Sequence, residues 1–367
     1  MLTKRNIVIL HPSDKSACAF YRCHAIATLL NTDKGGEVET IVSRAEINDD
    51  YILKYTAAVI FFRVQNAEQA TMLMHYKRKR GRFGFKIFVD YDDIIFNLKR
   101  GEKILPKWNP NYETHDDWHV AEIMHDALKD VDGVTVTTQW IKGCMEQRFG
   151  WNHVQILPNA VPRFAFGFHE PRLIGEKLVK PRVLYAGSTC HFSDGEPGDF
   201  AGAWIPWLKQ AVAEDRIELH LFQMPDFMKD VADKVKIHAQ TDAATFPATV
   251  AAIGPDFYLA PLADNPFNRA KSNLKLLEAS AVGAVLLGSS FLWSPYEEAY
   301  PLAKVTPDDT TESLARLFDN LCTPTHYNAA QAWQRTMMDE KHYWMDDLRY
   351  ISRWLRTFFG DTIQAHF

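Results

Sequence analysis

The chain has 367 residues, which is long for one compact domain and sufficient for two domains that each bury a core. Hydrophobic residues make up 47% of the chain and charged residues 24%, which excludes a disordered protein, a collagen-like repeat and a disulfide scaffold. The formal net charge of −5 excludes a general polyanion binder, so any contact with nucleic acid has to be local.

The cysteines and the apolar segments indicate the cellular compartment of the protein. The five cysteines are scattered and none forms a C-x-x-C pair, so neither a disulfide framework nor a zinc site is indicated. No apolar run approaches the roughly 18 residues that cross a bilayer, and the first residues lead into a strand rather than a signal peptide. We therefore expect a cytoplasmic protein without integral membrane association.

Short apolar runs alternate with amphipathic stretches in the first half of the chain. Continuous apolar strands separated by helices are typical of a parallel sheet covered on both faces. This pattern predicts a Rossmann-like domain over residues 1–165. The expected strands are 6–10, 38–42, 57–62, 86–89 and 134–137, and the expected helices are 18–30, 68–80 and 119–130.

The same alternation restarts after a proline-flanked stretch, 162–181, which is expected to link two domains. A second Rossmann-like domain is predicted over 166–340, and a helix rich in Trp and Arg within 341–367 is expected to return to the first domain. The fold class is therefore α/β, with two doubly wound domains facing a cleft. The expected strands of the second domain are 182–186, 217–222, 234–238, 256–260 and 284–287.

The most informative stretch, 265–284, follows a predicted strand and opens a helix. In open parallel sheets, ligands bind beyond the carboxyl ends of the strands. Ser272 and Asn273 are expected N-cap residues, and the first turn of the helix offers backbone N–H groups and a positive dipole end to an anion. The sequence therefore predicts an anion site at this helix end.

Charged side chains surround the same helix end. Arg269, Lys271 and Lys275 add three cations, and Glu278 follows about two turns further on, where it can accept hydrogen bonds from ribose hydroxyls. The alternative is a solvated helix edge on which Glu278 pairs with Lys275 at i,i+3.

A second informative loop follows the expected strand 182–186. Gly187 permits close approach of a ligand, and Ser188 can cap a helix or bind phosphate. His191 and Asp194 follow where a sugar hydroxyl needs paired donors and acceptors. The alternative for His191 is an ordinary loop histidine.

The stretch A-K-S-N-L-K-L-L-E-A-S-A-V-G-A, residues 270–284, resembles the donor-site signature of GT-B retaining glycosyltransferases of the group 1-like kind. In this form K-S-x-x-K-x-x-E replaces the more common E-x7-E pattern, and Ala270 stands at the first acidic position, a departure from the pattern. The segments Y-A-G-S-T-C-H-F-S-D, D-G-V-T-V-T-T-Q-W-I-K and V-Q-I-L-P-N-A-V resemble the same family. Together the matches cover most of the chain.

The resemblance implies a glycosyltransferase that moves a sugar from a nucleoside-diphosphate-sugar donor, such as a UDP-sugar, to an acceptor hydroxyl. It implies retention of configuration, no protein nucleophile, no bound metal and no other cofactor, because cations stabilise the leaving diphosphate. The first domain is expected to bind the acceptor and the second the donor. The expected diphosphate contacts are Gly187, Ser188, Arg269, Lys271, Ser272, Asn273 and Lys275, and the expected ribose and sugar contacts are Glu278, His191 and Asp194.

The motif D-Y-D-D, which contains Asp90, Asp92 and Asp93, ends the expected strand 86–89. A hard divalent cation suits such oxygens, and carboxylates also cap a following helical turn. We favour acceptor binding by Asp90 and general-base assistance by Asp92 or Asp93, because the second domain already supplies cations for the diphosphate.

Tyr21 and Arg22, in the first loop, are further candidates for acceptor contact. Six cations lie within residues 77–86, at the end of a predicted helix, and Lys79, Arg80 and Arg82 are the expected acceptor contacts among them. Such a run is usually a solvated face, and cations favour helix C-termini. As a phosphate-backbone contact, the run favours double-stranded DNA as the acceptor.

The compact chain, with its D-Y-D-D and N-R-A-K-S-N-L-K segments, is similar to bacteriophage glycosyltransferases that decorate hydroxymethylated pyrimidines in DNA. This similarity implies action in the host cytoplasm. A surface glycan or a lipid-linked sugar is the competing acceptor. A non-catalytic nucleotide-sugar-binding protein is the alternative of another class, because the same phosphate site supports binding without transfer.

Overall fold

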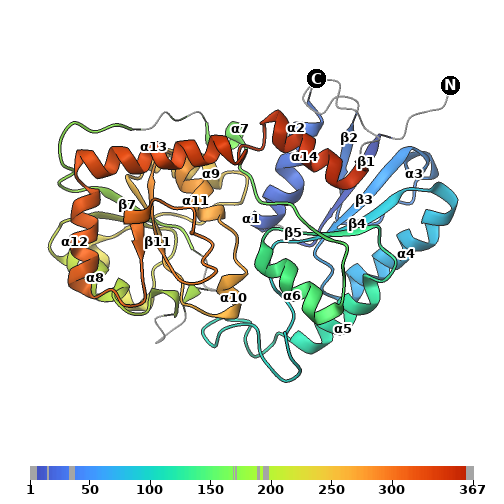
Figure 1. Ribbon diagram of the computed structural model, residues 1–367, viewed down its shortest axis with the longest axis horizontal. Coiled ribbons are helices and arrows are strands. Elements are labelled where there is room, and N and C mark those ends of the chain that lie inside the picture. Colours follow the sequence, from blue (N-terminus) through green and yellow to red (C-terminus); the bar gives the residue numbers. More distant parts are fainter. Residues whose placement is uncertain are drawn as a thin grey trace. The chain divides into compact units, whose positions relative to one another are not determined.

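A computed structural model describes residues 6–14, 16–32, 38–167, 169, 172–187, 191–192 and 198–360. The chain divides into two compact units, one comprising Met1–Ile104, Asp116–Pro162 and Trp344–Phe367, the other Leu105–His115 and Arg163–Tyr343. The described part of each unit contains a parallel six-stranded sheet flanked by helices, which confirms the predicted α/β class (Figure 1). No pattern in the sequence predicted that Leu105–His115 belongs to the second unit.

The first sheet has the strand order β2-β1-β3-β4-β5-β6. Its central strands are β-branched and aromatic, and β3 is buried almost throughout, as expected for a strand covered on both faces. The register aligns Ile9 with Val59 and Val59 with Ile87. The strands are β1 (Ile7–Pro12), β2 (Glu39–Val42), β3 (Thr56–Phe62), β4 (Lys86–Tyr91), β5 (Gly133–Val136) and β6 (Val154–Ile156).

The helices of the first unit begin and end at ordinary capping residues. The Asn66 side chain accepts from the Gln69 N–H at the start of α4, and Gly84, at φ 73, ends that helix in the left-handed region. A π-helical segment, Phe20–His24, lies between α1 and α2. The helices are α1 (Ala17–Ala19), α2 (Ala25–Leu30), α3 (Asp50–Tyr55), α4 (Ala67–Phe83), α5 (Asp117–Ala127), α6 (Gln139–Phe149) and α14 (Leu348–Phe359).

The C-terminal helix α14 packs against the first sheet, as predicted. Its buried residues recur at helical spacing and include Ile351, Leu355 and Phe358. The Phe358 ring centroid lies 5.1 Å from that of Phe88 in β4. A single parallel bridge between Val161 and Trp344 brings the start of this segment beside the residues that follow β6.

The second sheet has the strand order β12-β11-β10-β7-β8-β9. Its core is aromatic, with the Phe318 ring centroid 4.8 Å from that of Phe257 and 5.1 Å from that of Trp207. Strand β12 was not predicted, because two residues are too few to show a pattern. The strands are β7 (Arg182–Tyr185), β8 (Glu218–Leu221), β9 (Lys236–Ile237), β10 (Phe257–Ala260), β11 (Val285–Ser289) and β12 (Lys304–Val305).

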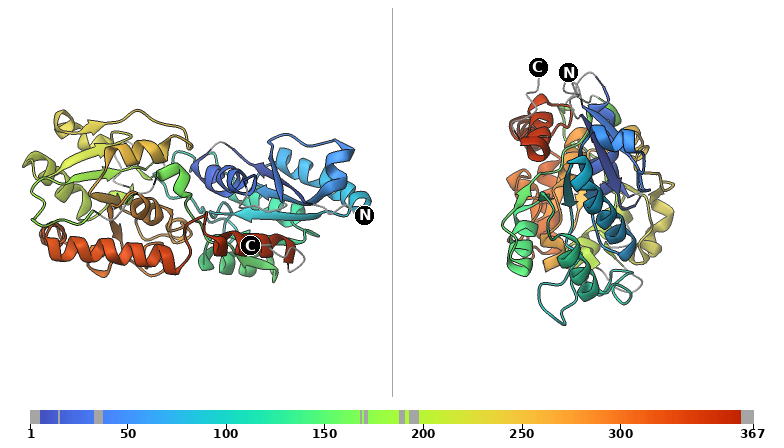
Figure 2. Two further views of the ribbon diagram at one scale, coloured as in Figure 1. Left: turned by 90° about the horizontal axis from the view of Figure 1, so that it is seen from above. Right: turned by 90° about the vertical axis from the view of Figure 1, so that its right-hand side faces the viewer.

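Helices flank the second sheet as well (Figure 2). The first of them, α7, lies within the expected linker 162–181. Over the described residues, no helix combines the length and apolar character needed to cross a membrane. The helices are α7 (Arg163–Phe166), α8 (Trp204–Ala213), α9 (Phe246–Ile253), α10 (Pro266–Arg269), α11 (Leu274–Ala281), α12 (Thr311–Leu321) and α13 (Pro324–Glu340), with 3-10 turns at Gly198–Phe200, Asp226–Lys234 and Pro301–Ala303.

Each sheet has one point at which the chain connections leave in opposite directions. In the first sheet this point lies between β1 and β3, and in the second between β7 and β10. Ligands of open parallel sheets bind at the carboxyl ends of the strands beside such a switch point. The loops that follow β7 and β10 are therefore where the second unit would hold a ligand.

Candidate active site

The structure brings the end of β7 together with the first turn of α11. The Nζ atom of Lys275 lies 4.9 Å from the ring centroid of Tyr185, the last residue of β7. A Cβ atom at Gly187 would overlap the hydroxyl of the same tyrosine, so a larger residue there requires the tyrosine side chain to shift. Gly187 and Lys275, both predicted to contact the diphosphate, therefore meet at the switch point.

The other two cations of this region already have neighbours. The Nζ of Lys271 lies 3.9 Å from the ring centroid of Phe267, one turn earlier. Arg269 donates to both carboxylate oxygens of Asp264, from Nε at 2.7 Å and from Nη2 at 3.0 Å, and this hydrogen bonding raises the pKa of Arg269. The ion pair neutralises the guanidinium, so Arg269 has less to offer a diphosphate than the sequence suggested.

The start of α11 differs in detail from the prediction. Asn273 occupies the N-cap position, but among the described contacts its side chain makes no capping hydrogen bond. Its Nδ2 instead donates to Glu298 Oε2 at 3.3 Å, and Ser272 lies one residue before the cap. Capping by the Asn273 side chain is therefore wrong, and this side chain does not occupy the helix end where an anion would bind.

A residue of the second sheet holds the side chain of Glu278 in place. Glu278 is 5% exposed, and its Oε2 accepts a hydrogen bond from the hydroxyl of Tyr258 in β10 at 3.0 Å. The tyrosine fixes the orientation of the carboxylate.

A buried carboxylate that the sequence analysis missed lies at the same edge. Asp199 is 2% exposed, and its Oδ2 lies 2.7 Å from Nδ1 of His191. Its Oδ1 accepts from the backbone N–H of Ala263 at 3.0 Å and from Nδ2 of Asn268 at 2.6 Å. His191 is therefore not an ordinary loop histidine but one half of a buried pair. The predicted contacts Ser188 and Asp194 lie outside the described residues.

A cavity of about 230 Å³ opens next to this carboxylate, at the carboxyl ends of β10, β11 and β12. Apolar side chains such as Trp204 and Phe291 form much of its wall. Its polar lining residues are Asp199, Asp264, Ser289, Ser290 and Thr306. The second unit therefore has room for a small ligand beside the switch point.

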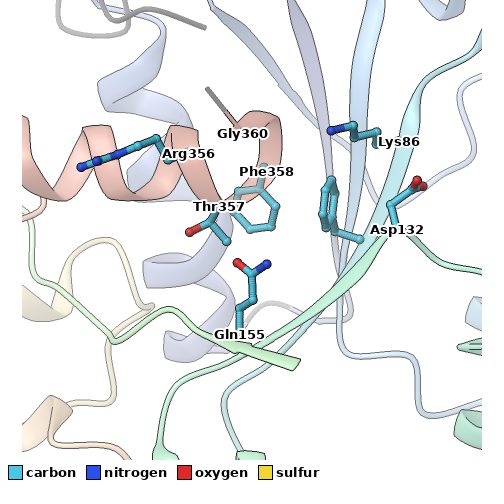
Figure 3. A pocket seen from close by; sticks show the side chains of 8 residues that line it. Lys86, Asp132, Gln155, Arg356, Thr357, Phe358 and Gly360 are labelled. Carbon is cyan, nitrogen blue, oxygen red and sulfur yellow. The ribbon is translucent and has the colours of Figure 1, made fainter. Parts of the chain in front are cut away.

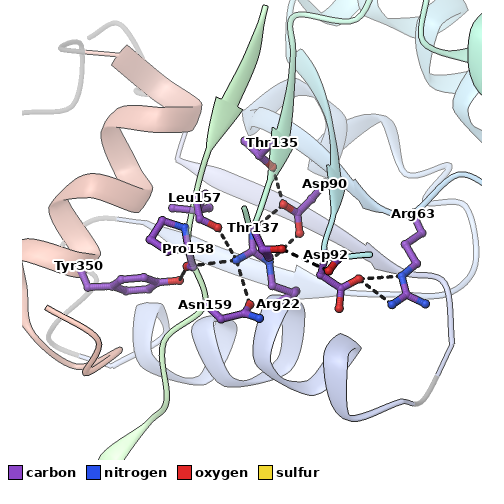
Figure 4. A network of polar contacts seen from close by, with 10 residues as sticks. All are labelled: Arg22, Arg63, Asp90, Asp92, Thr135, Thr137, Leu157, Pro158, Asn159 and Tyr350. Atoms are coloured by element: carbon purple, nitrogen blue, oxygen red, sulfur yellow. Dashed lines mark hydrogen bonds and ion pairs between the residues drawn. The ribbon is translucent and has the colours of Figure 1, made fainter. Parts of the chain in front are cut away.

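In the first unit, the structure corrects the acceptor prediction for Arg22 and Asp90 (Figure 4). Arg22 donates to both oxygens of Asp90, at 2.7 Å and 2.5 Å, and to the carbonyl oxygen of Leu157 at 2.9 Å. Thr135 also donates to Asp90. The two charged side chains are only 4% and 5% exposed, and Tyr21 is likewise buried. These residues hold the loop after β6 to the sheet and present no polar group to an acceptor.

Asp92 is a second buried carboxylate of this network (Figure 4). It accepts from Nε and Nη2 of Arg63, at 2.8 Å and 2.6 Å. Burial raises the pKa of Asp92, but the charge of Arg63 and hydrogen bonds from Cys18 and Arg63 outweigh it and keep the pKa below its usual value. A carboxylate with a lowered pKa is a weak proton acceptor, so a general-base role for Asp92 is not supported.

Asp93 differs from Asp92 in being partly exposed. Its Oδ1 accepts from the backbone N–H of Ile94 at 3.0 Å, but no helical turn follows these residues, so the capping alternative is wrong. Of the two candidates for general-base assistance, Asp93 is the accessible one. Among the described residues, no group of three or more His, Cys, Asp or Glu side chains is arranged to hold a metal ion.

The basic run lies at the wrong edge of the first sheet for an acceptor site shared with Asp93. It ends helix α4, which leads into the amino end of β4, whereas Asp93 follows the carboxyl end. The three members predicted to contact the acceptor are paired with acids: Lys79 with Glu46, Arg80 with Asp132 and Arg82 with Asp50, at 2.6, 3.1 and 2.7 Å. The solvated-face interpretation is therefore the better one.

A second cavity, of about 260 Å³, lies at this amino edge (Figure 3). Lys86 and Asp132 line it from the sheet, and Arg356 and Phe358 line it from α14. It is remote from the carboxyl ends of the strands, where ligands of parallel sheets bind.

Comparison with known proteins identifies the fold. No protein-family model matches the chain, and no curated protein matches it. A glycosyltransferase from Rickettsia africae ESF-5 has a TM-score of 0.58 and 12% identity over 98% of this chain and 100% of that chain. Anabaena Alr3699/HepE in complex with UDP has a TM-score of 0.59 and 12% identity over 95% and 98%. The chain has the fold of these proteins.

Staphylococcus aureus TarM, solved in complex with UDP, shares the fold over part of its length. Its TM-score is 0.54 and its identity 11%, covering 83% of this chain and 56% of TarM. The chain therefore spans just over half of TarM, whereas it spans all or nearly all of the two proteins above. The GT-B fold expected from the sequence is confirmed.

Proposed function

We propose that the chain is a glycosyltransferase that moves a sugar from a UDP-sugar to an acceptor hydroxyl. One observation supports this most: the switch point of the second sheet gathers Gly187, Lys275 and the start of α11 around the end of β7. That is the place for a diphosphate in this type of sheet. The fold likeness to proteins solved with UDP agrees with this ligand.

The proposed reaction needs charge stabilisation more than a nucleophile. The bond between the anomeric carbon and the diphosphate oxygen breaks, and its electron pair stays on UDP. The acceptor oxygen bonds to the same carbon, and its hydroxyl proton passes to an oxygen of the departing diphosphate. Lys271, Lys275 and the helix end would stabilise the negative charge that develops on UDP. Glu278 would bind the ribose. We propose retention of configuration, no bound metal and no other cofactor, as the family resemblance implies.

Thermal unfolding with nucleoside diphosphates tests the donor site. A ligand that binds only the folded protein raises the melting temperature, so UDP should raise it more than ADP. Equal effects of all nucleoside diphosphates, or none, would contradict a UDP site. Slow release of free sugar from a UDP-sugar, without acceptor, then distinguishes an enzyme from a non-catalytic binding protein, because only a catalyst cleaves the donor.

For the acceptor, we propose a hydroxymethylated pyrimidine in double-stranded DNA, from the resemblance to bacteriophage enzymes, which would act in the host cytoplasm. The basic run no longer supports this proposal, because Lys79, Arg80 and Arg82 are paired with acids. The alternative acceptors are a surface glycan and a lipid-linked sugar. Transfer of labelled sugar to hydroxymethylated duplexes, unmodified duplexes and glycan acceptors decides between them.

Duplex binding over a range of salt concentrations is the complementary measurement. Phosphate contacts make affinity fall steeply with salt. A flat response would contradict the DNA acceptor and leave the donor site unaffected.

A further inference from the structure

Two arginine–aspartate pairs lie near the carboxyl ends of the strands of the first sheet, and they differ in how fully the arginine is used (Figure 4). Arg22 donates from all three of its nitrogens. Nε and Nη2 bind Asp90, and Nη1 donates to three oxygens of the loop after β6. Arg63 donates from Nε and Nη2 alone, and both reach the same oxygen, Oδ1 of Asp92. A guanidinium has more N–H donors than this pairing uses.

The unused edge of the Arg63 guanidinium is turned away from Asp92, as Figure 4 shows. Because the group is planar, pairing through Nε and Nη2 leaves Nη1 and the outer N–H of Nη2 on another edge. Among the described residues, Nη1 has no hydrogen-bond partner, and it is not one of the buried polar atoms that lack a partner. Nη1 is therefore accessible. The Arg63 side chain is 14% exposed, whereas that of Arg22 is 4% exposed.

The backbone around Arg63 fixes the point from which this side chain leaves the sheet. The N–H of Arg63 donates to the carbonyl oxygen of Asp90 at 2.8 Å. The next residue, Val64, bonds through its N–H and its carbonyl oxygen to the hydroxyl of Tyr91. Between these anchors Arg63 adopts φ 58, a left-handed conformation that a residue with a β-carbon keeps only where its surroundings impose it. Such residues cluster at functional sites.

Arg63 lies at the place where a ligand of the first unit is expected. It is the first residue after β3, and the switch point of the first sheet lies between β1 and β3. Ligands of open parallel sheets bind at the carboxyl ends of the strands beside such a point. Asp93 follows the neighbouring strand β4 and is close enough to act electrostatically on Arg63. The unused guanidinium edge and an accessible carboxylate therefore share this end of the sheet.

The charges at this end of the sheet favour a neutral ligand. Asp92 balances the charge of Arg63, and Asp93, together with Asp14 after β1, adds negative charge. A phosphate or carboxylate would be repelled by this excess of carboxylates. Neutral oxygens accept hydrogen bonds from a guanidinium without that repulsion, and two N–H groups in a fixed geometry suit two neighbouring oxygens.

We propose that Arg63 binds the acceptor, by donating hydrogen bonds from Nη1 and Nη2 to two neighbouring neutral oxygens of that molecule. This inference rests on the proposed function. Asp92 holds the guanidinium from its other edge, and the acceptor lies at the end of β3, beside Asp93. The group that Arg63 recognises is a pair of hydroxyl or carbonyl oxygens rather than a phosphate. No covalent bond to Arg63 forms or breaks.

The experiment compares Arg63→Lys with Arg22→Lys in the full chain. Both variants keep a positive charge beside the aspartate, but the lysine ammonium is a point charge without a second edge. Arg22 is the matched control, because it is paired with Asp90 in the same sheet and all three of its nitrogens are used within the protein. The acceptor is the hydroxymethylated duplex, or the glycan if that is the one to which labelled sugar is transferred. Transfer gives the acceptor KM, calorimetry gives the affinity for UDP, and thermal unfolding gives the stability.

Arg63→Lys should raise the acceptor KM about tenfold, the scale of a pair of hydrogen bonds to neutral groups, with the affinity for UDP within about twofold. Arg22→Lys should lower the melting temperature and leave the acceptor KM unchanged. In the unaltered protein, millimolar inorganic phosphate should not compete with the acceptor, because the carboxylates at this end of the sheet repel it.

An unchanged acceptor KM in Arg63→Lys, or an equal rise in Arg22→Lys, overturns the contact. Competition between phosphate and the acceptor overturns the neutral class of ligand, and that measurement does not depend on the folding of any variant. Failure of the unaltered protein to bind UDP, or to transfer sugar to any of the acceptors, overturns the proposed function itself. That failure is seen before any variant is made, so the two failures are distinguished.

Discussion

Replacing Arg63, at the carboxyl end of β3, by alanine and by glycine separates two opposing contributions to the stability of the protein. One is the strained backbone conformation of Arg63, and the other is its ion pair with Asp92. Arg63 adopts φ 58, a left-handed conformation that costs a residue with a β-carbon roughly 1–2 kcal/mol. Its guanidinium also holds the buried carboxylate of Asp92 at 2.6–2.8 Å. Removing one partner of a buried ion pair costs about 3–5 kcal/mol, so the pair outweighs the strain. We therefore expect both variants to be less stable.

The difference in stability between the two variants should be smaller than the loss of stability in either of them. Both lose the ion pair, but glycine adopts the left-handed backbone without strain, and this gain is partly offset by its greater freedom in the unfolded chain. We expect the glycine variant to be more stable than the alanine variant by about 0.5–1 kcal/mol. Urea titration measures the free energy of unfolding of each variant. Hydrogen-exchange mass spectrometry on peptides of β3 and β4 assigns the change to the first unit.

The pH dependence of the same variants tests the sign of the Asp92 interaction. The folded-state pKa of Asp92 lies below its unfolded value of about 3.9, so the stability that it contributes is present above that value and is lost as the pH falls through the lowered pKa. Without Arg63, burial raises the pKa of Asp92, and the stability deficit of the variants should shrink as the pH falls from 7 toward 5. A deficit that stays constant over this range, or an alanine variant as stable as the glycine variant, would refute the reasoning.

Three further predictions follow from the described contacts. Lys271→Ala should lower kcat for donor cleavage at least about tenfold, because it removes a preorganised cation, and near-normal kinetics would show that the diphosphate binds elsewhere. Gly187→Ala should destabilise the second unit by about 1–3 kcal/mol, since its β-carbon displaces the Tyr185 hydroxyl, and an unchanged urea midpoint would contradict this packing. Arg82→Ala should change stability by less than about 0.5 kcal/mol and leave duplex affinity unchanged, because Arg82 forms an exposed ion pair with Asp50, whereas weaker duplex binding would restore the basic run as an acceptor contact.

The sequence was sufficient for the sheets because their strands are continuous apolar runs. The alternation of such runs with amphipathic segments predicted both parallel sheets. The Trp and Arg residues of 342–359 indicated the helix that returns to the first unit. Strands β6 and β12 and the membership of Leu105–His115 in the second unit were missed, because they depend on contacts distant in the sequence rather than on a local pattern.

The site was predictable only where a motif lies within one turn of the chain. Gly187 and Lys275 are both placed at the switch point, since a glycine after a strand and a cation at a helix start have local signatures. The partners of Arg269, His191 and Asp92 were not predicted. Asp264 is five residues from Arg269, and strands β8, β9 and β10 lie between Asp199 and its partners in the loop after β10. A buried charged residue is paired within the protein, whereas an exposed one can bind a ligand. A sequence motif does not show which of its residues are buried.

The return of the chain end to the first sheet limits how this protein can be cut into pieces. Tyr350 of α14 donates to the carbonyl oxygen of Pro158, and the N–H of Met345 donates to that of Val161. A fragment that stops at Pro162 would therefore leave bare the apolar surface that α14 covers, including Phe88. Exchanging the first unit between relatives requires transplanting two separate stretches, or joining the last helix to residue 162 through a short peptide.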